Sequence, residues 1–202
     1  MQDARTVLLD HLAKYAYRFS PEKPFLLASG AYSDEYLDCK LALSHPEAMT
    51  ALGAVFLATL QRAVVAIGGL TMGSDPIAMS TACASSTTDH PVRWFTVRKE
   101  AKEHGQKKLI EGSVADGEVV AVVDDVVTSG SSTIKAIDAC RNAGLNIAQV
   151  IVLVDRQQAD GIANIRRSAG EKIPVSAIFT KEEIKARWQE LNPQRLTLVK
   201  TG

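Results

Sequence analysis

The sequence has no net charge, only three cysteines and no long uninterrupted run of hydrophobic residues. Its 202 residues include 23 Lys and Arg and 23 Asp and Glu, and therefore no overall electrostatic field draws the chain to nucleic acid or to an anionic membrane. Any site that binds anions must be local. Cys39, Cys83 and Cys140 are too widely spaced for a metal-binding motif, and their odd number favours a reducing compartment over a disulfide framework.

Two further absences concern membranes and export. The most apolar stretch, residues 51–70, is interrupted by Gln61 and Arg62, and a helix followed by a strand explains it better than a membrane span. The first five residues, Met1-Gln2-Asp3-Ala4-Arg5, lack the charged and then apolar pattern of a signal peptide. We therefore expect a cytoplasmic protein that has neither a membrane nor a nucleic acid as its partner.

The length of the chain suggests a single domain, 1–202, which is large enough to bury a core. From residue 46 onward, apolar segments alternate with amphipathic ones, and this pattern predicts an α/β fold with a parallel sheet covered by helices on both faces. Residues 20–46 contain turn residues and short extended segments. The expected strands are 63–67, 92–97, 119–123, 147–154 and 173–179. The expected helices are 3–18, 47–62, 76–86, 131–143, 161–169 and 181–190.

Ligands of such sheets bind beyond the carboxyl ends of the strands, and one loop there combines carboxylates with a glycine-rich turn. Asp124 and Asp125 follow an apolar strand and precede a Thr-Ser-Gly turn, ending at Gly130, that leads into a helix. Backbone N–H groups at a helix start favour a phosphate, whereas paired carboxylates suit neighbouring sugar hydroxyls. No Lys follows the glycine, which excludes the nucleoside triphosphatase loop, and no G-x-G-x-x-G occurs. The pattern predicts a ribose phosphate site; the alternative is a Ser-rich helix cap after a solvated turn.

A second candidate is the basic loop of residues 98–108, which follows an expected strand and contains five Lys or Arg and one His. Arg can grip two phosphate oxygens at once, Lys acts as a point charge, and His104 can donate or move a proton near neutral pH. Gly105 supplies the flexible point that a closing lid would use. The alternative is a solvated helix in which Glu100 and Glu103 pair with neighbouring lysines.

Two other loops carry weaker signals. Residues 68–76 contain three glycines, which suit either a backbone-lined anion site or a tight connection between a strand and a helix. Arg156 stands at the end of another expected strand. A lone Arg in such a place is usually a surface residue.

Two of these motifs resemble a known enzyme family. Residues 119–133 resemble the motif with which type I phosphoribosyltransferases bind 5-phosphoribosyl 1-pyrophosphate (PRPP). The pattern Arg-Lys-x-x-Lys-x-His-Gly of residues 98–105, followed by Leu-Ile-Glu-Gly at 109–112, is similar to the signature loop of orotate phosphoribosyltransferases. The resemblance implies the type I phosphoribosyltransferase fold, with a mainly parallel central sheet flanked by helices in a core of about 46–180. A small hood would come from about 1–45, and the C-terminal segment is a further candidate for it.

The resemblance implies Mg²⁺-dependent transfer of the phosphoribosyl group from PRPP to orotate, giving orotidine 5′-monophosphate and pyrophosphate in de novo pyrimidine (UMP) biosynthesis. Mg²⁺ would be held mainly through the substrate, without a dedicated set of protein ligands. The family also implies a homodimer that shares the basic loop 98–108 between subunits. The alternatives are a phosphoribosyltransferase for another nucleobase, a PRPP-sensing regulator of nucleotide genes, and a catalytically silent member. The basic loop and Arg156 argue against another base, and the neutral charge argues against a nucleic-acid-binding regulator.

The resemblance also assigns roles to individual residues. Asp124 and Asp125 would hold the ribose 2′- and 3′-hydroxyls, and residues 128–132 would cradle the 5′-phosphate. Lys99 would reach into the site of the partner subunit, whereas Arg98, Lys102 and His104 would serve one subunit's own site. The catalytic residues implied are Lys102, His104, Asp124 and Asp125. The PRPP-binding residues implied are Arg98, Lys99, Lys102, His104, Asp124, Asp125, Val126, Val127, Thr128, Ser129, Gly130, Ser131 and Ser132.

For orotate, the resemblance implies Thr128 and Arg156, with the guanidinium of Arg156 paired to the orotate carboxylate. Two positions depart from the family pattern, because Ala28 and Met72 stand where many members have Lys. Contacts from these two positions to orotate or to pyrophosphate are therefore not carried over.

Overall fold

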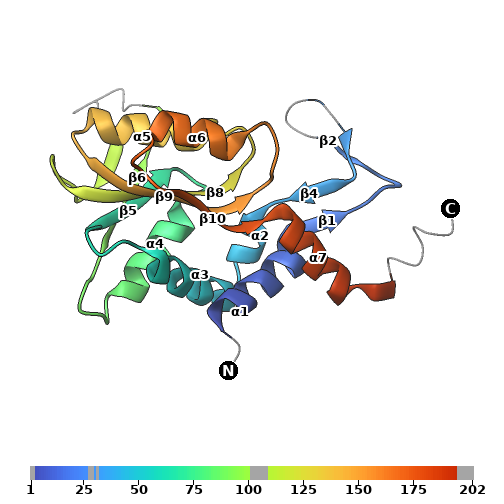
Figure 1. Cartoon of the computed structure of the whole chain (residues 1–202). Helices are drawn as coiled ribbons and strands as arrows, with labels where there is room; N and C mark the ends of the chain where they lie inside the picture. Colours follow the sequence, from blue (N-terminus) through green and yellow to red (C-terminus); the bar gives the residue numbers. More distant parts are fainter. Residues whose placement is uncertain (1–2, 27–29, 31, 101–108, 195–202) are drawn as a thin grey trace.

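The computed structural model describes residues 3–26, 30, 32–100 and 109–194. The centre of this part is a six-stranded sheet in the order β10-β9-β8-β5-β6-β7 (Figure 1). All neighbouring strands are parallel except β7, which pairs with β6 in the antiparallel sense. The strands are β5 (Ala66–Leu70), β6 (Arg93–Val97), β7 (Ile110–Gly112), β8 (Val119–Val127), β9 (Asn146–Asp155) and β10 (Val175–Thr180). The predicted α/β fold with a mainly parallel sheet is confirmed.

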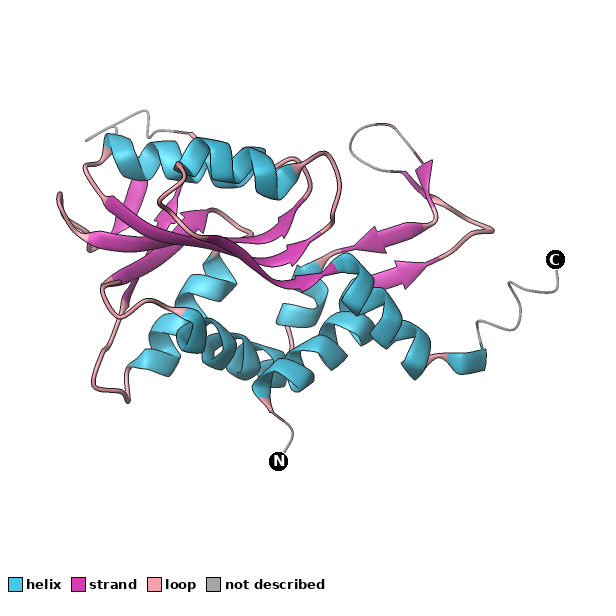
Figure 2. Ribbon diagram, in the orientation of Figure 1, coloured by secondary structure: helices cyan, strands magenta, loops and turns pink. Residues whose placement is uncertain are grey.

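Helices cover both faces of the sheet (Figure 2). On one face lie α5 (Ser131–Asn142) and α6 (Gly161–Ala169), and on the other lie α3 (Pro46–Thr59) and α4 (Asp75–Ser85). The central strands are apolar on both sides because each side packs against helices. Along β8, Val120 and Val122 belong to the core under α5 and α6, whereas Ala121 and Val123 belong to the core under α3 and α4.

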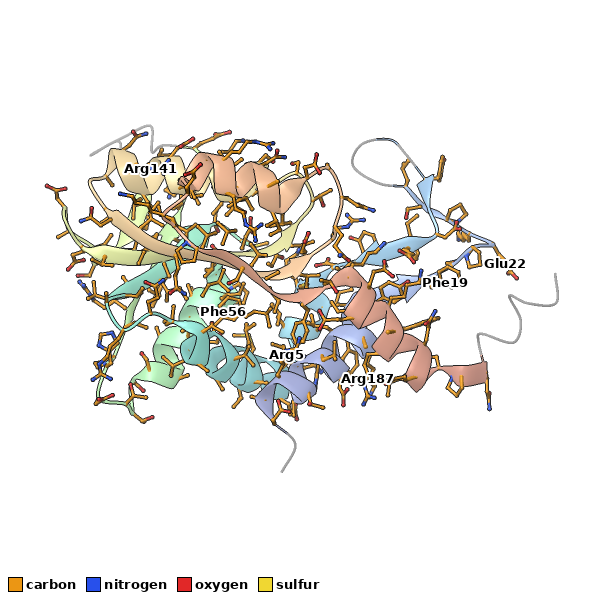
Figure 3. All side chains as sticks on the ribbon, viewed as in Figure 1. Arg5, Phe19, Glu22, Phe56, Arg141 and Arg187 are labelled. Carbon is orange, nitrogen blue, oxygen red and sulfur yellow. The ribbon has the colours of Figure 1, made fainter. Side chains whose placement is uncertain are left out.

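The second core also holds Phe56 of α3, which is fully buried on the side of the sheet opposite α5 and α6 (Figure 3). It continues into α1 (Ala4–His11) and the π-helical turn Leu12–Ala16, through the buried side chains of Leu8 and Leu12. The N-terminal helix is therefore packed into the same core as the sheet. No helix in the described ranges is long and apolar enough to cross a membrane.

The rest of the N-terminal segment forms two small antiparallel sheets beside the central one. In the first, β1 (Tyr17–Phe19) pairs with β4 (Glu35–Leu37), and in the second, β2 (Phe25–Leu26) pairs with β3 (Tyr32–Ser33). The short helix α2 (Cys39–Leu43) then leads back towards the central sheet. This segment thus extends from one side of the core (Figure 2).

The C-terminal helix α7 (Lys181–Leu191) is held to the N-terminal segment by ion pairs. The carboxylate of Glu35 lies 2.7 Å from Lys181 Nζ and 2.6 Å from Lys185 Nζ, and it accepts a hydrogen bond from Tyr17 at 3.0 Å. Burial alone would raise the pKa of Glu35, but these partners lower it to about 2. Arg187 of α7 pairs with Asp10 of α1 at 2.6 Å, where the two helices run side by side (Figure 3).

Several elements differ from the sequence-based expectation, including α2, which was not predicted, and the helix expected at 47–62, which ends at Thr59. The helix expected at 3–18 ends at Ala16, because Tyr17 and Arg18 belong to β1 and pair with β4. The strand expected at 63–67 lies at 66–70 and includes two glycines, since a Cβ at either glycine would clash with a neighbouring strand. The strand expected at 119–123 continues to Val127, and the short strand β7 was not predicted.

Candidate active site

The acid pair of the predicted PRPP motif lies on β8, near its carboxyl end, where it is partly covered by the loop after β5. Asp124 is only 4% exposed, and its Oδ2 accepts a hydrogen bond from Thr133 of α5 at 2.7 Å. A Cβ at Gly73 would clash with Asp125 Oδ1. Only glycine at this position therefore lets the loop lie so close to the carboxylates.

The surroundings of the two carboxylates disfavour their charged forms. Burial raises the pKa of Asp124 to about 7, helped by the neighbouring charge of Asp125 and opposed by the hydrogen bond from Thr133. Burial also raises the pKa of Asp125, although Lys40 and the N–H of Val126 act in the opposite direction. Carboxylates with raised pKa values at the carboxyl end of a parallel strand are candidates for a functional site.

The turn of residues 128–130 leads from β8 into α5 in a conformation suited to a phosphate. Gly130 has φ +82°, and a Cβ there would lie 2.8 Å from Ile165 Cγ1. The side chain of Asn164 donates a hydrogen bond to Ser129 O at 2.9 Å and thereby holds the turn against α6. The first N–H groups of α5 have no intrahelical partner, and they face the same end of the sheet as the turn. This arrangement can bind an anion.

The basic loop is anchored at its two ends by the β6–β7 pair. The N–H of Arg98 donates to Leu109 O at 2.8 Å, and its guanidinium lies 3.6 Å from the carboxylate of Glu111. Lys99 is exposed. Lys102 and His104, the two predicted catalytic residues of this loop, lie outside the described residues. Arg98 and Lys99 follow β6, two strands away from the acid pair of β8.

The loop after β5 is fixed by Asp75, whose role the sequence did not indicate. Both of its carboxylate oxygens are occupied, because Thr71 and Thr96 each donate a hydroxyl hydrogen bond at 2.6 Å. The Thr71–Met72 peptide bond is cis, and the Met72 side chain is 66% exposed. Asp75 therefore shapes the loop that covers the acid pair, through the side chains of two neighbouring strand ends.

Arg156 follows β9, the strand next to β8, and its backbone N–H donates to Val127 O at 3.0 Å. Its Nε is the one buried side-chain nitrogen or oxygen without a hydrogen-bond partner in the described part of the chain. An unpaired buried guanidinium N–H is costly, and such a group in a native structure calls for an explanation. A ligand that carries a carboxylate would supply the missing acceptor.

The structure thus brings most of the predicted residues to adjoining strand ends. Asp124, Asp125, Val126 and Val127 lie on β8 itself, residues 128–132 form the turn and the first residues of α5, and Arg156 follows the adjacent strand. Sequence reasoning missed Lys40 of α2, whose Nζ lies 3.8 Å from Asp125 Oδ2. Only the packing of the N-terminal segment brings this lysine there, and no local pattern in the sequence signals it.

The chain is similar to known proteins over most of its length. The chain is 41% identical to the orotate phosphoribosyltransferase of Nostoc sp. over 188 residues, which cover 93% of this chain and 88% of the relative. The chain belongs to the orotate phosphoribosyltransferase family. The family member of Aquifex aeolicus is 40% identical over 174 residues, covering 86% of this chain and 93% of the relative.

Solved structures lead to the same family. The orotate phosphoribosyltransferase of Mycobacterium tuberculosis H37Rv superposes with a TM-score of 0.75 and 28% identity, covering 90% of this chain and 98% of that structure. The fold is therefore the type I phosphoribosyltransferase fold. A scan against protein-family models gave no match.

Proposed function

We propose that the protein transfers the 5-phosphoribosyl group of PRPP to orotate, giving orotidine 5′-monophosphate and pyrophosphate for pyrimidine biosynthesis. The observation that carries the proposal is the pairing of two features at adjoining strand ends. One is the largely buried acid pair with its phosphate turn on β8, and the other is the buried, unpaired Nε of Arg156 after β9. The first suits a ribose phosphate, and the second suits the carboxylate that distinguishes orotate from uracil.

In this reaction N1 of orotate attacks the anomeric carbon of PRPP, and the bond from that carbon to the pyrophosphate oxygen breaks. Asp124 and Asp125 accept hydrogen bonds from the ribose hydroxyls, and their charge stabilises the positive charge that develops on the ring. Residues 128–132 hold the 5′-phosphate, with Val126 and Val127 as the adjoining backbone. Thr128 and Arg156 orient orotate. The acceleration comes mainly from positioning and from electrostatic stabilisation.

The basic loop would neutralise the leaving pyrophosphate. Arg98, Lys102 and His104 act in one subunit's own site, and closure of the loop excludes water, which would otherwise hydrolyse PRPP. Lys102 and His104 are assigned by resemblance to the family. The described start of this loop at Arg98 is fixed by the pairing of β6 with β7.

We expect Mg²⁺ to bind together with PRPP. We expect the cation to be held mainly by the substrate phosphates and water, because Mg²⁺ usually keeps several waters and binds with substrate phosphates and not in a dedicated protein cage. Mg²⁺ would supply charge neutralisation on the pyrophosphate.

A thermal scan tests this proposal. At a PRPP concentration of about 100 times its Kd, PRPP and Mg²⁺ together should raise the Tm by roughly 5 °C or more. Mg²⁺ alone should leave the Tm unchanged in a thermal scan. If Mg²⁺ alone raised the Tm as much as PRPP and Mg²⁺ together, the proposal that Mg²⁺ is held through the substrate would be wrong.

We propose a homodimer in which Lys99 completes the site of the partner subunit. Large apolar side chains on and beside α4 support an interface there, since Met72 is 66% exposed and Met79 is 40% exposed. Met49, Met79 and Cys83 line a hollow of about 350 Å³ between α3 and α4.

The three cysteines are unpaired, which suits the reducing cytoplasm where we expect the protein.

Subunit mixing tests this sharing. Lys99→Ala and Asp125→Asn should each inactivate the homodimer, because each removes one part of every site. After the two variants are unfolded and refolded together, half of the dimers are mixed and carry one site with both original residues. The mixture should regain about a quarter of the wild-type rate. If the rate stays at the sum of the two separate variants, Lys99 does not act across the interface.

The activity itself is tested by the loss of orotate absorbance on mixing the protein with orotate, PRPP and Mg²⁺. We expect loss that requires PRPP and that collapses in the Lys102→Ala variant, with retention of the wild-type Tm. Turnover of a purine or of uracil in place of orotate would keep the fold and overturn the proposed substrate.

A further inference from the structure

Lys40 of α2 joins the N-terminal segment to the acid pair of the central sheet. Its Nζ lies 2.8 Å from Asp38 Oδ1 and 3.8 Å from Asp125 Oδ2. No other ion pair reaches Asp124 or Asp125 within the described part of the chain. The lysine that pairs with Asp125 on β8 therefore comes from a different part of the fold.

The local structure of α2 fixes where this lysine stands. Asp38 caps the helix, because its carboxylate accepts the backbone N–H of Lys40 at 3.1 Å. The N–H of Asp38 in turn donates to Ala16 O at 3.1 Å, at the end of the π-helical turn. The start of α2 is thus held on two sides, and the Lys40 side chain needs only its own rotamers to move between the two carboxylates.

The geometry on the Asp125 side is specific. Asp125 Oδ1 already accepts the N–H of Val126 at 2.9 Å, and the other oxygen is the one that faces Lys40. The Asp125 side chain is 13% exposed and that of Lys40 is 49% exposed. At 3.8 Å the pair is longer than a charge-assisted hydrogen bond, and this leaves Oδ2 available to accept a ribose hydroxyl.

We infer that Lys40 is a positioning residue of the ribose end of the site, which holds the Asp125 carboxylate charged and directed towards the PRPP hydroxyls. This role presupposes the proposed function, and it goes beyond the loops that the family resemblance assigned. A merely structural ion pair is the alternative, but a pair that is half exposed on one side adds little to stability. The effect of Lys40 should therefore appear in PRPP binding and not in the Tm.

The charged and titratable groups that face Asp125 are Asp124 on the same strand and Lys40, Cys39 and Asp38 at the start of α2. Among them only Lys40 lowers the pKa of Asp125, which burial raises. Removing the lysine should raise that pKa further. The carboxylate would then lose its charge at a higher pH, and PRPP binding would weaken from the acidic side first.

The test is the Kd of PRPP with Mg²⁺, measured by calorimetry without orotate from about pH 5 to pH 8, above the ordinary pKa of an aspartate. Lys40→Met should weaken binding about tenfold at neutral pH, and the acidic loss of affinity should move to higher pH. Lys40→Arg should restore most of the affinity, because it keeps the charge. Lys172→Met, an exposed lysine in the turn before β10, is the matched control and should bind like the wild type.

An unchanged Kd and pH dependence in Lys40→Met would overturn the inference, as would weaker binding that Lys40→Arg fails to restore. A lowered Tm with normal PRPP affinity would show a structural ion pair only, and would overturn it as well. Because the measurement omits orotate, it separates the two claims. If the wild type binds PRPP but does not turn over orotate, the proposed function fails while the role of Lys40 is still decided.

Discussion

Replacing Asp124 by Asn is expected to lower kcat/KM for PRPP by about a hundredfold or more, and yet to stabilise the protein above neutral pH. The loss of activity follows because an amide carries no charge to set against the developing positive charge on the ribose. Asn is close to Asp in shape, and its amide can still pair with Thr133 and with the N–H of Asp125. The fold should therefore be retained.

The sign of the stability change follows from the raised pKa of Asp124, which burial brings to about 7 from an ordinary value of 3.8. A group whose folded-state pKa is raised contributes stability at low pH, and this stability is lost as the pH rises through the folded pKa. Wild-type stability should thus fall between about pH 4 and pH 7 relative to Asp124→Asn. At pH 8 the variant should be more stable by up to about 4 kcal/mol. Urea unfolding of both proteins at pH 5 and pH 8 measures the difference.

A less stable variant at pH 8, with activity lost only in proportion to unfolding, would show that Asp124 is a structural residue. Thr133→Val is a useful companion, because it removes the hydroxyl that donates to Asp124 and keeps the size of the side chain. That hydrogen bond lowers the pKa of Asp124. Its loss should raise the pKa further and move the acidic limit of activity to higher pH.

Replacing Arg156 by Ala is expected to raise the KM for orotate about a hundredfold, with little change in the affinity for PRPP. Hydrogen bonds to a charged group in a shielded site are worth about 1.5–3 kcal/mol each, and the guanidinium can offer two to one carboxylate. The buried Nε without a partner is the atom that a bound carboxylate would satisfy. Steady-state rates at varied orotate and saturating PRPP measure the effect.

Arg156→Lys separates charge from geometry. Lysine keeps the positive charge but cannot form the two-pronged contact, and it should recover only part of the loss. Uracil lacks the carboxylate, and the rate with uracil should therefore be nearly the same in the wild type and in Arg156→Ala. Equal losses with orotate and uracil would mean that Arg156 supports the loop and does not recognise the carboxylate.

The fold was largely predictable from the sequence because inner strands of the central sheet, such as β8, are apolar on both faces. Val119–Val123 indicates such a strand without reference to any other segment, and helix α6 was expected at the residues where it lies. The errors arise where tertiary contacts override local pattern. Gly68 and Gly69 read as a turn, but they lie inside β5 because close neighbours on either side leave no room for a Cβ.

The part of the candidate site that consists of neighbouring residues in the sequence was predictable. The residues that packing brings in from distant segments were not. The acid pair and its glycine turn are contiguous, and their order alone predicts a ribose phosphate site. Lys40 and Asp75 come from segments distant from the acid pair in the sequence. Lys40 is placed by the helix cap of Asp38, and Asp75 is held by the hydroxyls of two threonines. No periodicity or spacing could place either of them, and only the folded chain shows their contacts.

The most direct test of the account offers the protein a choice of bases. Orotate, uracil and hypoxanthine at equal concentration are incubated with the protein, PRPP and Mg²⁺, and the nucleotide products and pyrophosphate are quantified. We expect orotidine 5′-monophosphate as the dominant nucleotide, with one pyrophosphate released for each nucleotide formed and a rate about a hundredfold lower in Arg156→Ala at low orotate. A nucleotide of another base as the main product, or pyrophosphate release without any nucleotide, would contradict it.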